Sequence, residues 1–312
     1  GALCGSQNVR TGTEIMPLGA TTDPFEVLVK APGVKEREWL YAKQAALLSV
    51  KSTPGSFQAA WGLKENRIRV QLEVTLTADG RSDWVYAVSN GHPTLDVLEL
   101  VAPRLMPLRV GRAASDDALI WPFTAGERIE NPASRGELSV GYPDHGGFPW
   151  VDLFTEREGL YLGAHDPLLV NTMFTTKPAI DGQSMGFTIS KRHRVKAGTA
   201  QSYRFTLAVH AGDWHAGALL YRDYFYRQYR VNRYQPWLRE ADAWMFGTAV
   251  GDGGMRRSNQ AYADMERDFK NAAFMGFPYI QAWGSTFNGA CPTYYVPLAE
   301  RGGEAEFARM NR

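Results

Sequence analysis

The sequence lacks the features that mark several protein classes. It has only two cysteines, Cys4 and Cys291, among 312 residues, too few and too far apart for a disulfide framework or a zinc site. It has no run of 18 apolar residues, so no transmembrane helix is predicted. Lys plus Arg total 34 and Asp plus Glu total 33, and this near-neutral balance disfavours an electrostatic nucleic-acid binder.

Motifs for cofactors are missing as well. The segment 251–254, Gly-Asp-Gly-Gly, lacks the Lys-Ser/Thr of a phosphate loop, and no Gly-x-Ser-x-Gly elbow is present. Asp144 and His145 are two possible metal ligands without a third at usable spacing. We therefore predict no metal and no cofactor. No basic leader followed by an apolar stretch opens the chain, and the compartment stays open, with a periplasmic or secreted location slightly favoured.

What the sequence does contain is a strand pattern over about residues 24–210. Residues 67–76 alternate polar and apolar side chains for ten positions, which predicts a strand with one buried face. Asp79-Gly80 follows as a turn signal. Further short strands are expected at 26–29, 46–50, 84–88, 97–101, 137–140, 160–164, 173–175, 186–190 and 202–209. Many short strands without helices between them indicate an antiparallel sandwich.

The pattern changes at Gly212. Asp213 is a plausible N-cap for a helix that continues to about Arg230. Beyond it, residues 244–250 and 279–284 are apolar runs typical of buried strands, 258–275 has helical periodicity, and 304–309 begins another helix. Strand, helix, strand, helix is the order found in a parallel sheet or barrel.

Seven short segments carry recognisable motifs: 117–123, 141–143, 148–154, 159–166, 210–215, 279–284 and 294–297. Together they resemble an uncharacterised family of bacterial glycoside-hydrolase-like proteins. The resemblance implies an antiparallel supersandwich of the galactose-mutarotase-like kind, a linker helix, and a (β/α)8 TIM barrel. We therefore expect a β-sandwich over 1–211, a linker helix and connector over 212–243, and the start of a barrel over 244–312.

A complete barrel needs roughly 250 residues, whereas residues 244–312 supply about two βα units. We expect the chain to be a fragment whose remainder is missing, or a protein completed by a partner such as a second copy in a homo-oligomer.

Glycoside hydrolysis needs two carboxyl groups flanking the scissile bond, and in barrels they stand at the carboxyl ends of strands. Asp252 follows the first predicted barrel strand and is a candidate catalytic or substrate-binding residue; the alternative is a loop-capping role. The resemblance implies that the main acid pair belongs to later strands, beyond this chain.

Aromatic and amide side chains follow the second barrel strand. An indole can stack on a sugar ring, so Trp283 is a candidate sugar platform, with barrel core as the alternative. Asn288, Tyr294 and Tyr295, in the loop beyond, are candidates for lining the same cleft.

The sandwich motifs add Trp150, Asp152, His165 and Asp166 as candidate substrate-binding residues. The alternative is structural: Trp150 in the core, and His165 with Asp166 at the end of a strand. Neighbouring strand residues point to opposite faces, which disfavours a direct pair between His165 and Asp166. The basic run 191–194 is expected to be a solvated hairpin end.

Two hypotheses remain at this stage. The chain is part of a glycoside hydrolase that acts on a poly- or oligosaccharide through paired carboxylates, or it is a non-catalytic carbohydrate-binding or structural β-sandwich. We expect a carbohydrate partner for the hydrolase and for a carbohydrate-binding protein, and no nucleic-acid partner.

Overall fold

The structure is a computed structural model that describes residues 6–7, 11–17, 23–168, 170–230, 236–239, 241, 245–248, 262–278, 280–283, 297, 299 and 302–310. The chain divides into two compact units, Gly1–Arg230 and Val231–Arg312, which are described separately below. None of the helices in the described ranges is long and apolar enough to cross a membrane.

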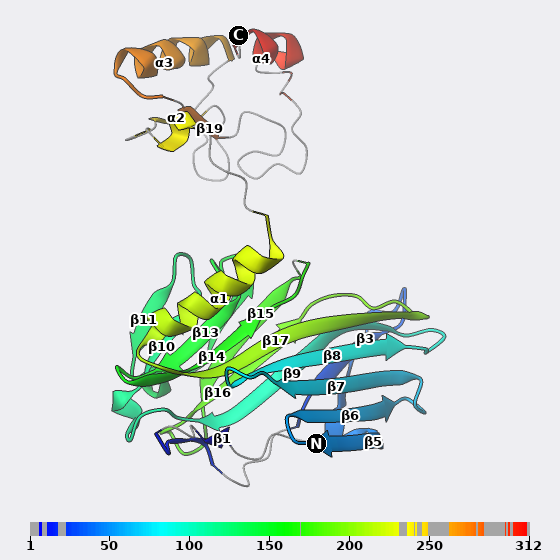
Figure 1. The fold of residues 1–312 in the computed structure, drawn as a ribbon. Helices are drawn as coiled ribbons and strands as arrows, with labels where there is room; N and C mark the ends of the chain where they lie inside the picture. Colours follow the sequence, from blue (N-terminus) through cyan, green and yellow to red (C-terminus); the bar gives the residue numbers. More distant parts are fainter. Residues whose placement is uncertain are drawn as a thin grey trace. The chain divides into compact units, whose positions relative to one another are not determined.

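The first unit consists mainly of two antiparallel sheets (Figure 1). The strands of the larger sheet follow the order β11-β10-β13-β14-β17-β8-β7-β6-β5, and those of the smaller sheet the order β12-β15-β16-β9-β3-β4. Strands β1 (Ser6–Gln7) and β2 (Glu14–Met16) form a separate two-stranded sheet. The larger sheet contains β5 (Ala46–Thr53), β6 (Ser56–Leu63), β7 (Ile68–Leu76), β8 (Arg81–Asn90), β10 (Ala118–Trp121), β11 (Glu127–Glu130), β13 (Trp150–Phe154), β14 (Glu158–Ala164) and β17 (Thr199–Ala211). The smaller contains β3 (Glu26–Lys30), β4 (Glu38–Tyr41), β9 (Asp96–Leu108), β12 (Leu138–Tyr142), β15 (Thr172–Pro178) and β16 (Met185–Lys191).

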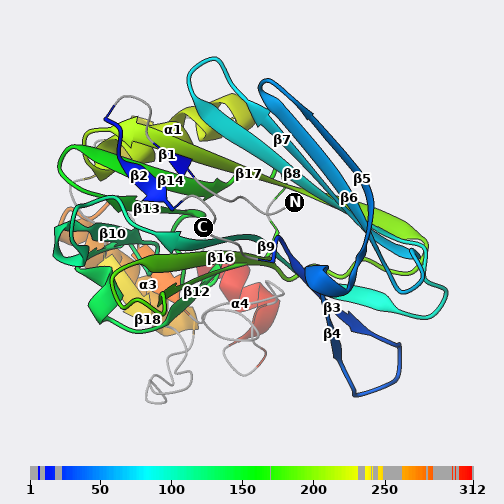
Figure 2. The same ribbon diagram turned by 90° about the horizontal axis from the view of Figure 1, so that it is seen from below.

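The core lies between the two sheets, which Figure 2 shows from below. Strand β7 confirms the alternation in the sequence: Ile68, Val70 and Leu72 are buried in the core, whereas the residues between them are exposed. Its neighbour β8 pairs Val70 with Val88 and Leu72 with Tyr86. The antiparallel sandwich predicted from the alternation is thus present.

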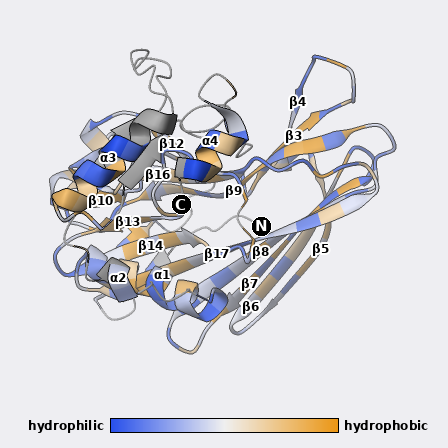
Figure 3. Cartoon of the chain, turned by 90° about the horizontal axis from the view of Figure 1, so that it is seen from above, coloured by the Kyte–Doolittle hydropathy of each residue, from blue (hydrophilic) through white to orange (hydrophobic). Residues whose placement is uncertain are grey.

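Helix α1 (Trp214–Gln228) contacts β13, β14 and β17 on the outer face of the larger sheet (Figure 1). The predicted N-cap is confirmed, since Asp213 accepts a hydrogen bond from the backbone N–H of His215. Strand β13 is buried at all five positions. Figure 3 accordingly shows β13 and β14 as largely hydrophobic and β6–β8 as mixed.

Several strands have no counterpart among those predicted: β1, β2, β4, β6, β10, β11 and β13. Strands β10 and β13 were present in the sequence only as apolar motifs, because strands covered on both faces do not alternate. At the far edge of the larger sheet every residue of β5 is exposed, including Leu47 and Val50.

The second unit contains α2 (Pro236–Arg239), β18 (Met245–Thr248), α3 (Tyr262–Phe274), β19 (Ile280–Trp283) and α4 (Gly303–Met310). Strands β18 and β19 pair in parallel, and such a pair requires a crossover connection, here the segment that contains α3. Gly276 has a φ of 85° just after α3, as the predicted C-cap requires. The described residues show this one βαβ unit and no further barrel strand.

Candidate functional site beneath helix α1

The structure brings Trp150, Asp152, His165 and Asp166 to one region of the first unit, around α1. Trp150 and Asp152 belong to β13, and His165 and Asp166 directly follow β14. The first three are nearly inaccessible, with exposed fractions of 5%, 0% and 7%.

Of the candidate site residues in the second unit, the structure describes only the backbone of Trp283. Trp283 ends β19, where its backbone is opposite Thr248, and its side chain lies outside the described part of the structure. Asp252, Asn288, Tyr294 and Tyr295 lie outside the described residues altogether, so their roles stay predictions.

Asp152 forms a buried pair with His210, a residue of β17. Nε2 of His210 lies 2.8 Å from Oδ2 of Asp152, and their side chains are 8% and 0% exposed. The second carboxylate oxygen, Oδ1, is buried and has no hydrogen-bond partner within the described residues. Burial raises the pKa of Asp152 to about 6, against the opposing effect of His210.

The pKa of His210 is also raised. Burial alone would lower it, but the hydrogen bond to Asp152 and the charge of that carboxylate outweigh burial. Both shifts favour retention of protons by the pair in the folded state. A carboxyl group and an imidazole that hold protons in this way can act as an acid–base couple, but only for a ligand that reaches them.

Two glycines leave room for this pair. A Cβ atom at Gly217, in α1, would lie 1.7 Å from Oδ2 of Asp152. A Cβ atom at Gly159, in β14, would lie 2.5 Å from Cε1 of His210. The helix backbone therefore approaches the carboxylate directly, and the pair fills the space between α1 and the sheet.

His165 is the centre of a second buried network. Its Nδ1 lies 2.9 Å from Oγ1 of Thr206, and its Nε2 lies 2.8 Å from the hydroxyl of Tyr161. Thr206 donates its only hydroxyl proton to Asp83, so it accepts from the imidazole Nδ1–H, and Nε2 then accepts from Tyr161. This arrangement requires the neutral ring.

The charge state agrees with this network. Burial lowers the pKa of His165 to about 3, and the positive charges of Arg81, Arg227 and Lys191 act in the same direction. The ring also stacks on Tyr224 of α1, with centroids 4.1 Å apart and planes 12° apart. His165 therefore holds the helix to the sheet as a neutral side chain.

Asp166 points elsewhere, as expected for a residue adjacent to His165. Its carboxylate forms a salt bridge with Lys191, whose side chain is fully buried, and Lys191 also donates to Oγ1 of Thr172 over 2.8 Å. The prediction of a solvated basic run is thus wrong for Lys191: strand β16 places it inside. Burial lowers its pKa, against the effect of Asp166.

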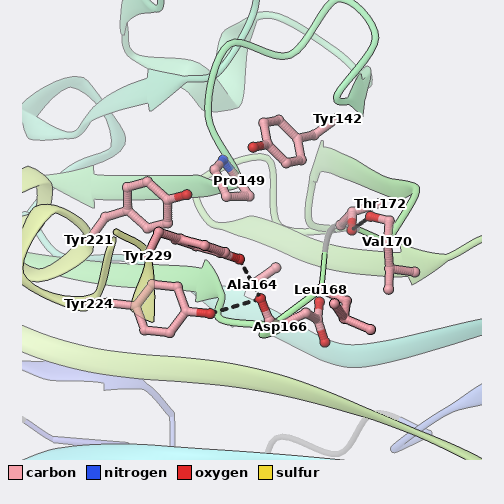
Figure 4. Close-up of a pocket in the computed structure, with 10 residues that line it drawn as sticks. All are labelled: Tyr142, Pro149, Ala164, Asp166, Leu168, Val170, Thr172, Tyr221, Tyr224 and Tyr229. Atoms are coloured by element: carbon pink, nitrogen blue, oxygen red, sulfur yellow. Dashed lines mark hydrogen bonds between the residues drawn. The ribbon is translucent and has the colours of Figure 1, made fainter. Parts of the chain in front are cut away.

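The backbone of Asp166 is held as well. Tyr224 and Tyr229 donate hydrogen bonds to its carbonyl oxygen over 2.8 and 3.1 Å. Figure 4 shows these two rings beside Asp166, with Tyr221 and Tyr142 on the same side. The turn after β14 is therefore attached both to the smaller sheet and to the end of α1.

Trp150 completes the contact with the helix. Its ring stacks on Phe148, with centroids 4.4 Å apart, and belongs to a buried cluster against which Trp214 and Tyr221 of α1 pack. The burial of Trp150 and His165 is what their structural alternative predicts, and Asp152 is buried with them.

Sequence reasoning missed His210, Gly217 and the internal position of Lys191. His210 belongs to the motif at residues 210–215, but no role was predicted for it. It is 58 residues away from Asp152 in the chain, and pairing across strands is not visible in a single sequence. Among the described residues, no group of three or more His, Cys, Asp and Glu side chains is arranged to hold a metal ion.

No protein-family model matches this chain, and no curated protein matches it in sequence. Among solved structures, the ligand-free α-N-acetylgalactosaminidase NagBb from Bifidobacterium bifidum is similar over 90% of this chain and 52% of its own, with 13% identity and a TM-score of 0.58. A quadruple mutant of that enzyme gives 15% identity and a TM-score of 0.59, over 91% of this chain and 51% of its own. The chain spans about half the length of these structures, and it has a glycoside-hydrolase-like fold.

Proposed function

We propose that this chain is the supporting sandwich and the first part of the barrel of a glycoside hydrolase that acts on poly- or oligosaccharides. The reaction would proceed through paired carboxylates and an oxocarbenium-like transition state, with the main acid pair on later barrel strands. The observation that carries the proposal is the similarity to NagBb over 90% of the chain.

The order of elements in the second unit supports the barrel. Parallel strands β18 and β19, joined through α3, are the repeating unit of a (β/α)8 barrel. Asp252 follows the carboxyl end of β18 and Asn288, Tyr294 and Tyr295 follow that of β19. In barrel enzymes this end of the strands carries the active site.

Within this proposal the residues around the two strands have distinct roles. Trp283, Asn288, Tyr294 and Tyr295 form part of the sugar-binding wall, and Asp252 binds substrate or takes part in catalysis. Trp150, Asp152, His165 and Asp166 fix α1 to the sandwich, a role that their burial and hydrogen bonds support.

The test is glycosidase activity of the protein as its gene encodes it, with its intact mass measured alongside. Because NagBb is an α-N-acetylgalactosaminidase, the first substrate is an aryl α-N-acetylgalactosaminide, followed by other aryl α-glycosides and a polysaccharide panel. We expect release of the aryl group, and a loss of activity of about 100-fold or more in Asp252→Asn if that residue is catalytic. The matched control is Asp223→Asn, on the exposed face of α1, which should leave activity unchanged.

The alternative is a non-catalytic carbohydrate-binding or structural protein. It is favoured by one observation: the carboxylates of the sandwich motif, Asp152 and Asp166, are committed to His210 and Lys191. Glycan binding without turnover of any substrate would establish this alternative. If the complete protein neither binds nor cleaves any glycan, the hydrolase function and the carbohydrate-binding function are both rejected.

A further inference from the structure

A cleft lies on the outer face of the larger sheet, beside α1. It has a volume of about 250 Å³, and its walls include Arg81 and Asp83 of β8, Arg204 of β17, Tyr224 and Arg227 of α1, and His165. All of these residues belong to the first unit. The cleft thus lies between α1 and the outer face of strands β8 and β17.

Strand periodicity explains how these side chains reach the same face. In β17, Tyr203, Phe205 and Leu207 point into the core, so Arg204 and Thr206 point outward. In β8, Arg81 and Asp83 are on the corresponding outer face, with Asp83 directly opposite Thr206. Tyr224 and Arg227 are three residues apart in α1 and therefore share one side of the helix.

Positive charge dominates the cleft. Neither Arg204 nor Arg227 has a carboxylate partner among the described residues, and Arg227 donates only to the carbonyl oxygen of Asp223. Arg81 pairs with Asp79 through Nη2, yet its Nε is buried without a hydrogen-bond partner in the described residues. Buried N–H groups of this kind are normally satisfied, so the guanidinium of Arg81 retains hydrogen-bonding capacity beyond its pair with Asp79.

The buried imidazole agrees with a site of positive potential. Arg81 and Arg227 contribute to the lowered pKa of His165, so their charges act across the cleft wall. Asp83 accepts from Thr206 through Oδ1 over 2.7 Å and retains further lone pairs for a hydroxyl donor. The cleft therefore presents guanidinium donors for an oxyanion and one carboxylate acceptor for hydroxyl groups.

We propose that this cleft binds an acidic sugar, with the Arg81, Arg204 and Arg227 guanidinium groups on its carboxylate and Asp83 on a ring hydroxyl. Planar guanidinium groups are the preferred partners of carboxylates in proteins. The volume favours a sugar over a bare inorganic anion, because about 250 Å³ approaches the roughly 300–1,000 Å³ of small-molecule sites in proteins. The sugar identity rests on the proposed function, whereas the preference for an anion does not.

The test is calorimetric titration of the 312-residue chain with D-galacturonate, D-glucuronate, D-galactose and inorganic sulfate at low ionic strength. We expect a uronate to bind at least about tenfold tighter than galactose and sulfate, and its affinity to fall as salt is added, because the contact is between charges. Arg204→Gln and Arg227→Gln should each weaken uronate binding by about tenfold or more. Arg222→Gln, which removes a guanidinium outside the cleft from the same helix, should leave it unchanged.

The outcomes separate the two proposals. Equal affinity for galactose and uronate, or unchanged uronate affinity in both cleft variants, would overturn the anion site. Sulfate binding as tight as uronate binding would overturn the sugar assignment. Because the readout is binding, failure of the aryl-glycoside assay leaves this result intact, and thermal unfolding of each variant controls for folding.

Discussion

The two halves of the larger sheet follow different rules, although one set of hydrogen bonds runs through both. Strands β13 and β14 are buried at every position, because α1 covers one face and the smaller sheet the other. Strand β7, in the other half, is buried only at alternate positions over its first six residues. Where a helix covers the second face, a polar side chain loses contact with water and requires a hydrogen-bond or charge partner within the protein.

Around the covered half, buried polar side chains have specific partners. Under the helix, Asp152 pairs with His210, and His165 contacts Thr206 and Tyr161; next to it, Lys191 of the smaller sheet pairs with Asp166. Away from the helix, Lys64, just after β6, and Glu38, in β4, also pair over 2.6 Å, but their side chains are 32% and 53% exposed. Water can replace either partner there, so this pair contributes little.

The largest expected effect comes from breaking a buried ion pair. Asp166→Asn leaves the Lys191 ammonium without its counter-charge, and should cost about 3–5 kcal/mol of unfolding free energy. Glu38→Gln, which breaks the exposed pair, should cost about 0.5 kcal/mol or less. Denaturant unfolding of both variants gives the comparison. Equal costs would contradict the difference between buried and exposed pairs, and recovery of stability in the double variant Asp166→Asn with Lys191→Met would confirm that the unpaired ammonium is the cause.

The next effect concerns the space between helix and sheet. Gly217→Ala places a methyl group at a position 1.7 Å from Oδ2 of Asp152, so α1 or the Asp152–His210 pair must move, at an expected cost of about 3 kcal/mol. Leu219→Ala, at an exposed helix position, should change stability by about 0.5 kcal/mol or less. Thermal unfolding checks both, and a neutral Gly217→Ala would show that the helix is not closely packed there.

A pH-dependent effect isolates His165. Its folded-state pKa of about 3 is below the ordinary value of 6.5, so its contribution is complete above pH 6.5 and is lost as pH falls toward 3. The stability difference between wild type and His165→Gln should therefore shrink by about 2–3 kcal/mol from pH 7 to pH 4.5.

The comparison with His165→Gln is needed because Asp152 titrates in the same pH range, and its effect on stability has the opposite sign. Its raised pKa makes the folded state gain stability as pH falls through about 6. Both proteins contain Asp152, so its contribution cancels. A pH-independent difference between them would mean that the imidazole is not held neutral.

The smallest effect is at the start of the covering helix. Asp213→Ala removes the side-chain acceptor for the N–H of His215 and should cost about 1 kcal/mol. Asp213→Asn, which retains the acceptor, should cost less. Equal losses in the two variants would show that the carboxylate charge, and not the hydrogen bond, stabilises the helix end.

Predictability from the sequence follows the same division of the sheet. Strand β7 could be predicted because one wet face produces alternation, and α1 because Asp213 marks its start. Strands β10 and β13 could not, since apolar runs with both faces covered do not distinguish strand from helix. Lys191 could not be placed inside from composition, because its burial depends on Asp166, 25 residues earlier in the chain.

For the candidate site, residue types could be predicted but partners could not. Asp152 and His165 were predicted as candidate substrate-binding residues, and both are centres of buried networks. Their partners His210 and Thr206 are on β17, far along the chain, and only the strand register aligns them. A lone sequence therefore indicates that such residues matter locally without showing what each one contacts.

The close approach of Gly217 and Gly159 to one carboxylate and one imidazole has an evolutionary consequence. Positions 152, 159, 210 and 217 cannot accept changes one at a time, because a larger residue at either glycine collides with the pair. A lineage that acquires alanine at position 217 should also carry a smaller side chain at position 152, so substitutions at these sites should appear in relatives as linked sets.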